Sequence, residues 1–333
     1  MMDDIITLDY GSGGKKTAHL IEKRILPPLG NPALNELDDG AVLDGAGKIV
    51  FSSDSFVVEP LFFPGGDIGK LSVCGTVNDI SVCGGEPKYL SCSLIIEEGF
   101  ETSQLERVMA SIAAACEKAG VKVVTGDTKV VERGRGDKLY INTAGIGFLK
   151  YPGLSKRNIR AGDKVIISGT VGDHGAAVML ARSGVLQGEL CSDCAALNRL
   201  CDAVLLRTEG VRVLRDPTRG GVATTLNEFI EGTSLGIELD EKAVPVRPAV
   251  QTACDLLGLD ALYCANEGKL LAVVSADSAE EILRKMRETP EGRDAAVIGE
   301  VTEKYAGKLV MNTAFGGKRI LQKLSGAQLP RIC

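Results

Sequence analysis

The chain has 333 residues, a formal net charge of −6 and a hydrophobic content of 44%. Its net negative charge and its lack of tryptophan argue against nucleic-acid binding, which needs basic surface and aromatic stacking platforms. It contains no run of eighteen apolar residues, and its first residues are acidic, so we predict neither a membrane span nor a signal peptide. We therefore expect a cytoplasmic protein of about two domains whose ten cysteines are reduced.

A glycine-rich loop lies near the start of the chain, at residues 11–16, before a helix predicted over about 17–25. Backbone N–H groups of such a loop, together with the N-terminus of a helix, favour phosphate binding. Gly13 and Lys15 are therefore candidate nucleotide ligands. The spacing is not that of a P-loop, and a flexible linker is an equally good interpretation.

Further along the first half, Ser103 and Glu106 form a capping-box pattern that predicts a helix start, and Gly120 predicts its end. An apolar run over 121–124 predicts a buried strand that runs into Thr125-Gly126-Asp127-Thr128. A second strand is expected over 139–149. Tyr151-Pro152-Gly153 then interrupts the pattern, and we place a domain boundary after residue 153.

The second half again mixes helix and strand patterns, so both halves are of the α/β or α+β class. A strand begins at Lys164. Other strands are predicted over about 235–239, 268–275 and 295–301. Helices are predicted over about 174–184, 195–209, 219–231 and 278–288. The predicted units are residues 1–153, residues 154–323 and a mobile tail, 324–333.

Five segments place aspartates in glycine-rich or turn-like settings beside apolar runs. They are Asp38-Asp39-Gly40, Ser53-Asp54-Ser55, Asn78-Asp79, Gly126-Asp127-Thr128 and Asp216-Pro217-Thr218. Carboxylates that follow buried strands point to the edge of a sheet, where open α/β folds bind ligands. Converging carboxylates need a cation, and their hard oxygens suit Mg²⁺ carried by nucleotide phosphates. Each aspartate taken singly is equally compatible with a helix cap or an Asx-turn.

The cysteines allow two interpretations. Cys333 ends a tail that can move, so its thiol can carry a covalent group between sites, although a chance cysteine on a frayed end is the simpler alternative. Cys191, Cys194 and Cys201 supply three thiols, whereas a closed zinc site wants four ligands. Cys74, Cys83 and Cys92 are best explained as small hydrophobic residues of the core.

Together, the segments 54–56, 65–70, 76–80 and 84–87 resemble the ATP-binding superfamily of aminoimidazole ribonucleotide synthetase, selenophosphate synthetase and thiamine-monophosphate kinase. Residues 126–130 and 216–221 fit the same superfamily. Within it, the terminal Pro330-Arg331-Ile332-Cys333 is similar to the end of the hydrogenase maturation family HypE. The resemblance covers essentially the whole chain.

The resemblance implies two α/β domains, with the N-terminal ones paired in a homodimer. It implies that Cys333 accepts a carbamoyl group from a HypF-like carbamoyltransferase. The enzyme then uses ATP to dehydrate this group to a thiocyanate, and the cyanide passes to iron on a HypC–HypD complex for [NiFe]-hydrogenase. ATP and Mg²⁺ are the implied cofactors, and neither nucleic acid nor membrane is an implied partner.

The same chemistry suggests roles for particular residues. Phosphoryl transfer depends on positioning and charge neutralisation, which makes the aspartates the expected metal ligands. These are Asp39 (or Asp38), Asp54, Asp79, Asp127 and Asp216, and the nucleotide ligands add Asn78, Gly126 and Thr128. Forming a nitrile also requires a base near the carbamoyl nitrogen. Lys129 and Glu267 occupy the family positions, and we favour Glu267 as the base and Lys129 as a positioning or relay group. A phosphate clamp (Lys129) and a structural cap (Glu267) are the alternatives.

Two other functions fit parts of the sequence. A selenophosphate synthetase-like enzyme would carry a reactive cysteine in the loop 11–16, which has none. A non-enzymatic thiol metallochaperone would use the cysteines, bind metal and leave ATP intact. It gives no reason for the glycine-flanked aspartates.

Overall fold

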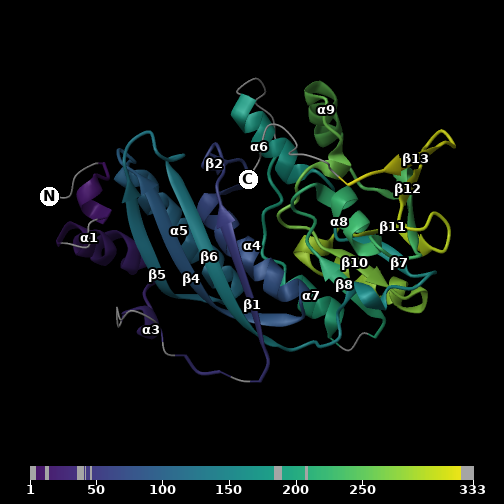
Figure 1. The fold of residues 1–333 in the computed structure, drawn as a ribbon, viewed down its shortest axis with the longest axis horizontal. Helices are drawn as coiled ribbons and strands as arrows, with labels where there is room; N and C mark the ends of the chain where they lie inside the picture. Colours follow the sequence, from purple (N-terminus) through teal and green to yellow (C-terminus); the bar gives the residue numbers. More distant parts are fainter. Residues whose placement is uncertain are drawn as a thin grey trace.

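The computed structural model describes residues 5–11, 15–35, 41, 43–45, 47–183, 190–206 and 209–323. Within them, strands of the first half form a four-stranded sheet and strands of the second half form a seven-stranded sheet, which lie at opposite ends of the long axis (Figure 1). Helices α4 and α7 and the segment 190–197 lie between the two sheets. The sheets fall on either side of residue 153, and the domain limits themselves stay a prediction.

The first sheet has the strand order β1-β6-β4-β5. Only β4 and β5 run parallel among these neighbours; the other pairs are antiparallel. The bounds are β1 Ile49–Phe56, β4 Gly85–Glu97, β5 Lys122–Val131 and β6 Leu139–Leu149, beside the small pair β2 Phe62–Phe63 and β3 Gly66–Asp67. The strand predicted over 139–149 is thereby confirmed.

One face of this sheet is covered by α4 (Ile68–Val82), which packs on β1, β6 and β4, with α5 (Thr102–Ala119) beside it. The approach is close because β6 has glycine at two contact points. A Cβ on Gly145 or Gly147 would come within 2.7 or 2.5 Å of the Ile80 side chain. Apolar residues of α4, α5 and the strands form one core beneath the helices.

Short helices precede the first sheet: η1 Leu8–Gly11, α1 Lys15–Leu20, a π-helical turn η2 Ile21–Ile25, α2 Leu26–Leu29 and α3 Pro32–Asn35. The predicted helix over 17–25 therefore begins at Lys15 and widens into a π turn. No described helix is long and apolar enough to cross a bilayer.

The second sheet has the order β13-β12-β9-β11-β7-β10-β8, antiparallel except for the pair β9–β12. Its strands are β7 Lys164–Ile167, β8 Val211–Arg215, β9 Gly236–Asp240, β10 Leu271–Val274, β11 Ala296–Thr302, β12 Leu309–Asn312 and β13 Lys318–Leu321. Its helices are α6 Asp173–Ser183, α7 Asn198–Leu205, α8 Gly221–Ile230, α9 Pro248–Leu257 and α10 Ala279–Arg287. Separate apolar cores fill its two faces.

Several sequence predictions need correction. The capping box is wrong, because α5 has Glu101 as its N-cap and Ser103 lies inside the helix; Gly120 does end it, in the left-handed conformation. The buried strand expected over 121–124 is longer, because the segment 125–128 is also part of β5. The predicted helix over 195–209 is shorter, as α7, and α9 was not predicted at all. Cys74 and Cys92 are buried, but Cys83 is exposed.

Candidate active site

Three of the predicted metal ligands lie near one another between the two sheets, although no three His, Cys, Asp or Glu side chains of the described residues are placed so that they could hold one metal ion. Asp54 lies in β1 on the face that packs against α4, where a Cβ on Gly75 would be 3.6 Å from its carboxylate. Asp79 projects from α4 and accepts a hydrogen bond of 2.6 Å from the hydroxyl of Ser52, which lies in β1 with Asp54. Asp216 directly follows β8. Only Asp216 follows a strand as predicted: Asp54 lies within one and Asp79 on a helix.

The turn that carries Asp216 is held against the segment 262–267. Gly221 has a positive φ of 61°, and a Cβ there would lie 2.5 Å from the carbonyl oxygens of Leu262 and Cys264. Asn266 donates from its backbone and its side chain to the Pro217 carbonyl oxygen, each at 3.1 Å. Glycine is therefore required at position 221 by this contact, which brings Asp216 next to Glu267.

Glu267 is buried, and the segment 190–197 holds its backbone. Its N–H donates to Asp193 Oδ1 at 3.1 Å, and its carbonyl oxygen accepts from the Ala195 N–H at 3.2 Å. Asn78 of α4 joins the same contact, since its Nδ2 donates to the Ala195 carbonyl and its Oδ1 accepts from the Leu197 N–H. Segments from both halves of the chain thus fix the position of Glu267.

Electrostatics in this group disfavour negative charge. Burial, then repulsion from Asp79 and Asp54, raises the pKa of Asp216 to about 7. Burial, then the charges of Asp216 and Asp193, raises the pKa of Glu267 well above its usual value. Burial also raises the pKa of Asp54, with Asp79 adding to it. Asp54, Asp79, Asp216 and Glu267 are called the acidic cluster below.

A cation would relieve this repulsion, and the carboxylates of the acidic cluster are the type of donor that a hard divalent ion takes. Carboxylate oxygens are the ligands that Mg²⁺ prefers, and burial without a paired cation is costly for each of them. Arg219 lies at the rim, with its Nη2 3.6 Å from Asp54 Oδ1 and its side chain 82% exposed. Its exposure leaves it available to a triphosphate.

Asp127 and Lys129 lie on the opposite face of the first sheet. Asp127 is in register with Ser93, Asn142 and Ser55 across β5, β4, β6 and β1. Asn142 donates to the Ser55 hydroxyl at 2.9 Å, which confirms that these side chains share a face. Asp127 and Lys129 form an exposed ion pair of 3.4 Å. Within one chain they therefore do not join the acidic cluster.

The remaining predicted nucleotide ligands are also divided. Thr128 is buried, and with Gly126 it borders a cavity of about 210 Å³ under the N-terminal helices, which the acidic cluster does not line. Asn78 is fully buried with its amide engaged inside the chain, so here it positions Glu267. Roles of these residues in nucleotide binding stay predictions.

Other predicted residues lie outside the described ranges. These are Gly13, Asp38, Asp39 and the acceptor Cys333; Lys15 begins α1, and its side chain is not described.

Two residues of the site were not assigned a role from sequence. Arg219 lies in the segment 216–221, and its charge next to Gly220 and Gly221 was a signal that could have been used. Asp193 lies in the segment interpreted through its cysteines, and nothing local to that segment indicates a contact with Glu267.

Comparison with known proteins defines the class. Residues 37–149 match the model of the AIR synthase related protein N-terminal domain, and residues 160–312 match that of its C-terminal domain. A solved structure described as hydrogenase maturation protein HypE in complex with ATP superposes with a TM-score of 0.95 at 49% identity, over 98% of this chain and 99% of that chain.

Carbamoyl dehydratase HypE of Azotobacter vinelandii is 47% identical over 332 residues, covering 98% of this chain and 97% of the relative. A HypE chain from a crystal structure of a HypE–HypF complex superposes with a TM-score of 0.80 at 46% identity, over 92% of this chain and 99% of that chain. The chain belongs to the HypE family of hydrogenase maturation proteins, within the AIR synthase related superfamily.

Proposed function

We propose that the chain is an ATP-dependent carbamoyl dehydratase that converts an S-carbamoyl group on Cys333 into a thiocyanate for hydrogenase maturation. The observation that carries this proposal is the acidic cluster, where carboxylates from both halves meet beside the buried Glu267. The names of its relatives, carbamoyl dehydratase HypE and HypE in complex with ATP, support the activity and the nucleotide.

The reaction needs oxygen to leave carbon. Transfer of the γ-phosphoryl group of ATP to the carbamoyl oxygen converts that oxygen into part of a phosphate leaving group, and ADP departs. Loss of phosphate, together with loss of both N–H protons, leaves the S–C≡N group on Cys333. Mg²⁺ would supply charge neutralisation on the phosphate oxygens.

The chain's own residues have distinct parts in this scheme. Asp54, Asp79 and Asp216 would hold the cation, with Asp39 as a further ligand, and Arg219 would face the phosphates. Glu267 would accept a proton from the carbamoyl nitrogen, because a carboxylate whose pKa is raised is a stronger base once ionised. A cation among the neighbouring aspartates favours that ionised form.

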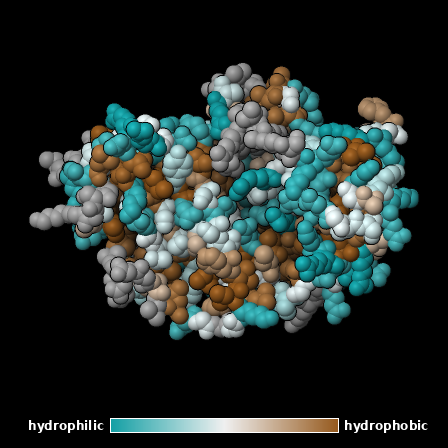
Figure 2. Space-filling model, viewed as in Figure 1, coloured by the Kyte–Doolittle hydropathy of each residue, from teal (hydrophilic) through white to brown (hydrophobic). Residues whose placement is uncertain are grey.

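The catalytic role of Lys129 requires a second copy of the chain. The sheet face that carries Lys129 exposes Ile49 and Phe51 to 61% and 63% and Ile95 to 42%. Figure 2, viewed from the same side as Figure 1, shows hydrophobic patches over this region. Two such faces packed about a two-fold axis along the strands bring β5 of one copy over β1 of the other. Asp127 and Lys129 would then approach the partner's acidic cluster.

Mixing two inactive variants tests this shared site. Lys129→Ala and Glu267→Gln are each expected to be inactive as homodimers. If the two side chains come from different subunits, co-refolded mixtures recover roughly a quarter of the wild-type rate, because half of the dimers hold one intact site. A mixture that sediments as dimers but recovers no activity would contradict the arrangement.

The partners follow from the chemistry. A HypF-like carbamoyltransferase would load Cys333, as supported by the solved complex of HypE with HypF, and a HypC–HypD complex would accept the cyanide. The test is mass spectrometry of the C-terminal peptide after incubation with HypF, carbamoyl phosphate and ATP–Mg²⁺, with Cys333→Ala as control. A carbamoyl adduct that becomes a cyano adduct only with ATP supports the proposal. Absence of any adduct on Cys333 would overturn it.

A further inference from the structure

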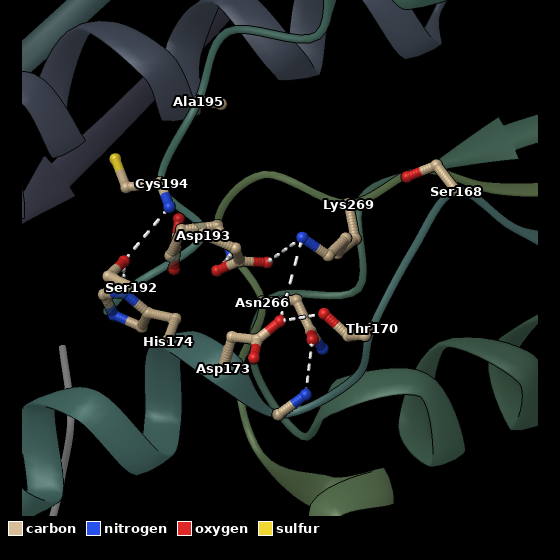
Figure 3. Close-up of polar contacts among 12 residues, drawn as sticks. Ser168, Thr170, Asp173, His174, Ser192, Asp193, Cys194, Ala195, Asn266 and Lys269 are labelled. Atoms are coloured by element: carbon tan, nitrogen blue, oxygen red, sulfur yellow. Dashed lines mark hydrogen bonds and ion pairs between the residues drawn. The ribbon is translucent and has the colours of Figure 1, made fainter. Parts of the chain in front are cut away.

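A buried ion-paired group contacts the segment that carries Glu267, whose neighbours Asn266 and Lys269 are labelled in Figure 3. Its members are Asp173 at the start of α6, Asp193, and Lys269, with side chains exposed to 1%, 2% and 11%. Lys269 Nζ lies 3.5 Å from Asp193 Oδ2 and 3.9 Å from Asp173 Oδ2, between the two carboxylates. Asp173, Asp193 and Lys269 are called the paired cluster below.

Asp193 uses its two oxygens in two different directions. Oδ2 faces the ammonium of Lys269, whereas Oδ1 accepts the backbone N–H of Glu267 at 3.1 Å. The backbones are also in contact, because a Cβ on Gly268 would lie 1.8 Å from the Asp193 carbonyl oxygen. A shift of Asp193 would therefore move Glu267.

Lys269 is itself fixed. Thr170 donates its hydroxyl hydrogen to Asp173 Oδ2, and Arg247 Nε lies 3.5 Å from Asp173 Oδ1, so that carboxylate has partners on both sides. The Lys269 side chain passes close to the backbone of Gly169, since a Cβ on Gly169 would be 3.1 Å from Lys269 Cε. The ammonium thus has a defined place from which to hold Asp193.

The segment that carries Asp193 is anchored on its other side as well. His174 Nδ1 lies 2.8 Å from the Ser192 hydroxyl oxygen, which accepts the Cys194 N–H at 3.0 Å (Figure 3). Burial lowers the pKa of His174 to about 4, so this ring is neutral and adds no charge to the paired cluster at physiological pH.

We propose that Asp193, oriented by Lys269, is a positioning residue that places Glu267 for proton removal. The proposal rests on the proposed role of Glu267 as the base. An asparagine at 193 cannot satisfy both contacts, because its amide would turn an NH₂ group either toward the Lys269 ammonium or toward the Glu267 N–H. Asp193→Asn should therefore displace Glu267 while leaving Asp54, Asp79 and Asp216 in place.

The chain provides a matched control. Asp163 is buried, accepts the Arg160 N–H at 2.8 Å and lies 3.2 Å from Arg212 Nε, so it makes the same two kinds of contact. It precedes β7, whereas the paired cluster lies beyond the other end of that strand, which spans Lys164–Ile167. Asp163→Asn removes a comparable ion pair away from Glu267.

The experiment follows the conversion of carbamoylated Cys333 by mass spectrometry after addition of ATP–Mg²⁺ to the full-length protein. The number of ATP-binding sites is measured by ATP titration. Asp193→Asn should slow conversion to the cyano adduct at saturating ATP by about tenfold or more, with an unchanged KM for ATP, because a displaced catalytic group lowers kcat. Asp163→Asn should stay within about twofold of wild type. Conversion by Asp193→Asn at the wild-type rate would overturn the proposal, as would an equal loss in both variants.

A double variant separates this inference from the role of Glu267. If Asp193 acts through Glu267, adding Asp193→Asn to Glu267→Gln should cause no further loss, and a further tenfold loss would count against it. If Glu267→Gln converts the carbamoyl adduct at the wild-type rate, Glu267 is not the base, and the positioning role of Asp193 is overturned as well. If Glu267→Gln converts the carbamoyl adduct slowly but Asp193→Asn converts it at the wild-type rate, only the positioning role is overturned. If Asp193→Asn does not fold, Asp193→Glu keeps the charge but displaces the acceptor, and should show the same loss in kcat.

Discussion

Two neighbouring groups of aspartates differ in what balances their charge. In the acidic cluster, burial of Asp216 is reinforced by repulsion from Asp79 and Asp54. In the paired cluster, burial and the charge of Asp193 raise the pKa of Asp173, but the Thr170 hydroxyl, Lys269 and Arg247 oppose the shift. The same residue type at similar burial is therefore charge-balanced in one place and unbalanced in the other. The unbalanced group is the one that suits a cation carried by a nucleotide.

The largest effect should come from removing the cation of the paired cluster. Lys269→Met leaves Asp173 and Asp193 buried without the ammonium between them, and breaking a buried pair in this way costs about 3–5 kcal/mol. Urea unfolding measures it. Lys164→Met, which removes a surface pair with Glu300, should cost at most about 1 kcal/mol. Equal losses in the two variants would mean that Lys269 does not balance the aspartates.

In the acidic cluster, the expected loss is in ligand binding. Asp79→Asn removes a negative ligand oxygen beside Asp54 and Asp216, and we expect ATP affinity in Mg²⁺ to fall about 100-fold, or about 2.7 kcal/mol. Isothermal titration calorimetry measures it. Asp202→Asn, which removes a surface aspartate paired with Lys150, is the control and should bind normally. Normal binding by Asp79→Asn would exclude Asp79 from the site.

The two clusters were not equally visible in the sequence. The aspartates of the acidic cluster stood out because each lies among turn-like residues, and their metal-binding role stays a prediction. Their local structure could not be predicted. Asp79 lies in α4, whose residues are buried almost all round, so no amphipathic period marks the helix. Likewise, Gly126 suggests a turn, yet it lies in β5, where glycine is needed because a Cβ would be 2.1 Å from the Cys92 carbonyl oxygen.

The paired cluster was not predicted, for a physical reason. Its ion pair joins Asp193 to Lys269 across the seven-stranded sheet's loops, and no local pattern encodes which distant charges meet. By contrast, strand alternation places Asp127 and Lys129 on one face and Thr128 on the other, which a period of two predicts once the strand is known. Their separation from Asp54 depends on the sheet register, which the sequence alone did not reveal.

Neutralising one member of the acidic cluster should stabilise the metal-free protein. A carboxyl whose pKa is higher in the folded than in the unfolded chain contributes less stability as pH rises, here from about 4 to about 7. Asp216→Asn removes that loss, so at pH 8 in EDTA it should be more stable than wild type by up to about 4 kcal/mol, at about 1.4 kcal/mol per unit of pKa. At pH 4 or below the two should agree. Unfolding curves at both pH values measure this, and saturating Mg²⁺ should shrink the gain at pH 8 because the cation stabilises the ionised wild type.

The smallest effect concerns the rim of the acidic cluster. Arg219 pairs with Asp54 at 3.6 Å but is mostly exposed, so Arg219→Gln should change the free energy of unfolding by less than about 0.5 kcal/mol. ATP affinity should nevertheless fall several-fold at low salt, because the triphosphate loses a facing guanidinium, and the difference should shrink at high salt. Lys318→Gln, another exposed cation paired with Glu238, should leave affinity unchanged. If both variants bind ATP alike at low salt, Arg219 only screens Asp54, and the acidic cluster meets the phosphates without it.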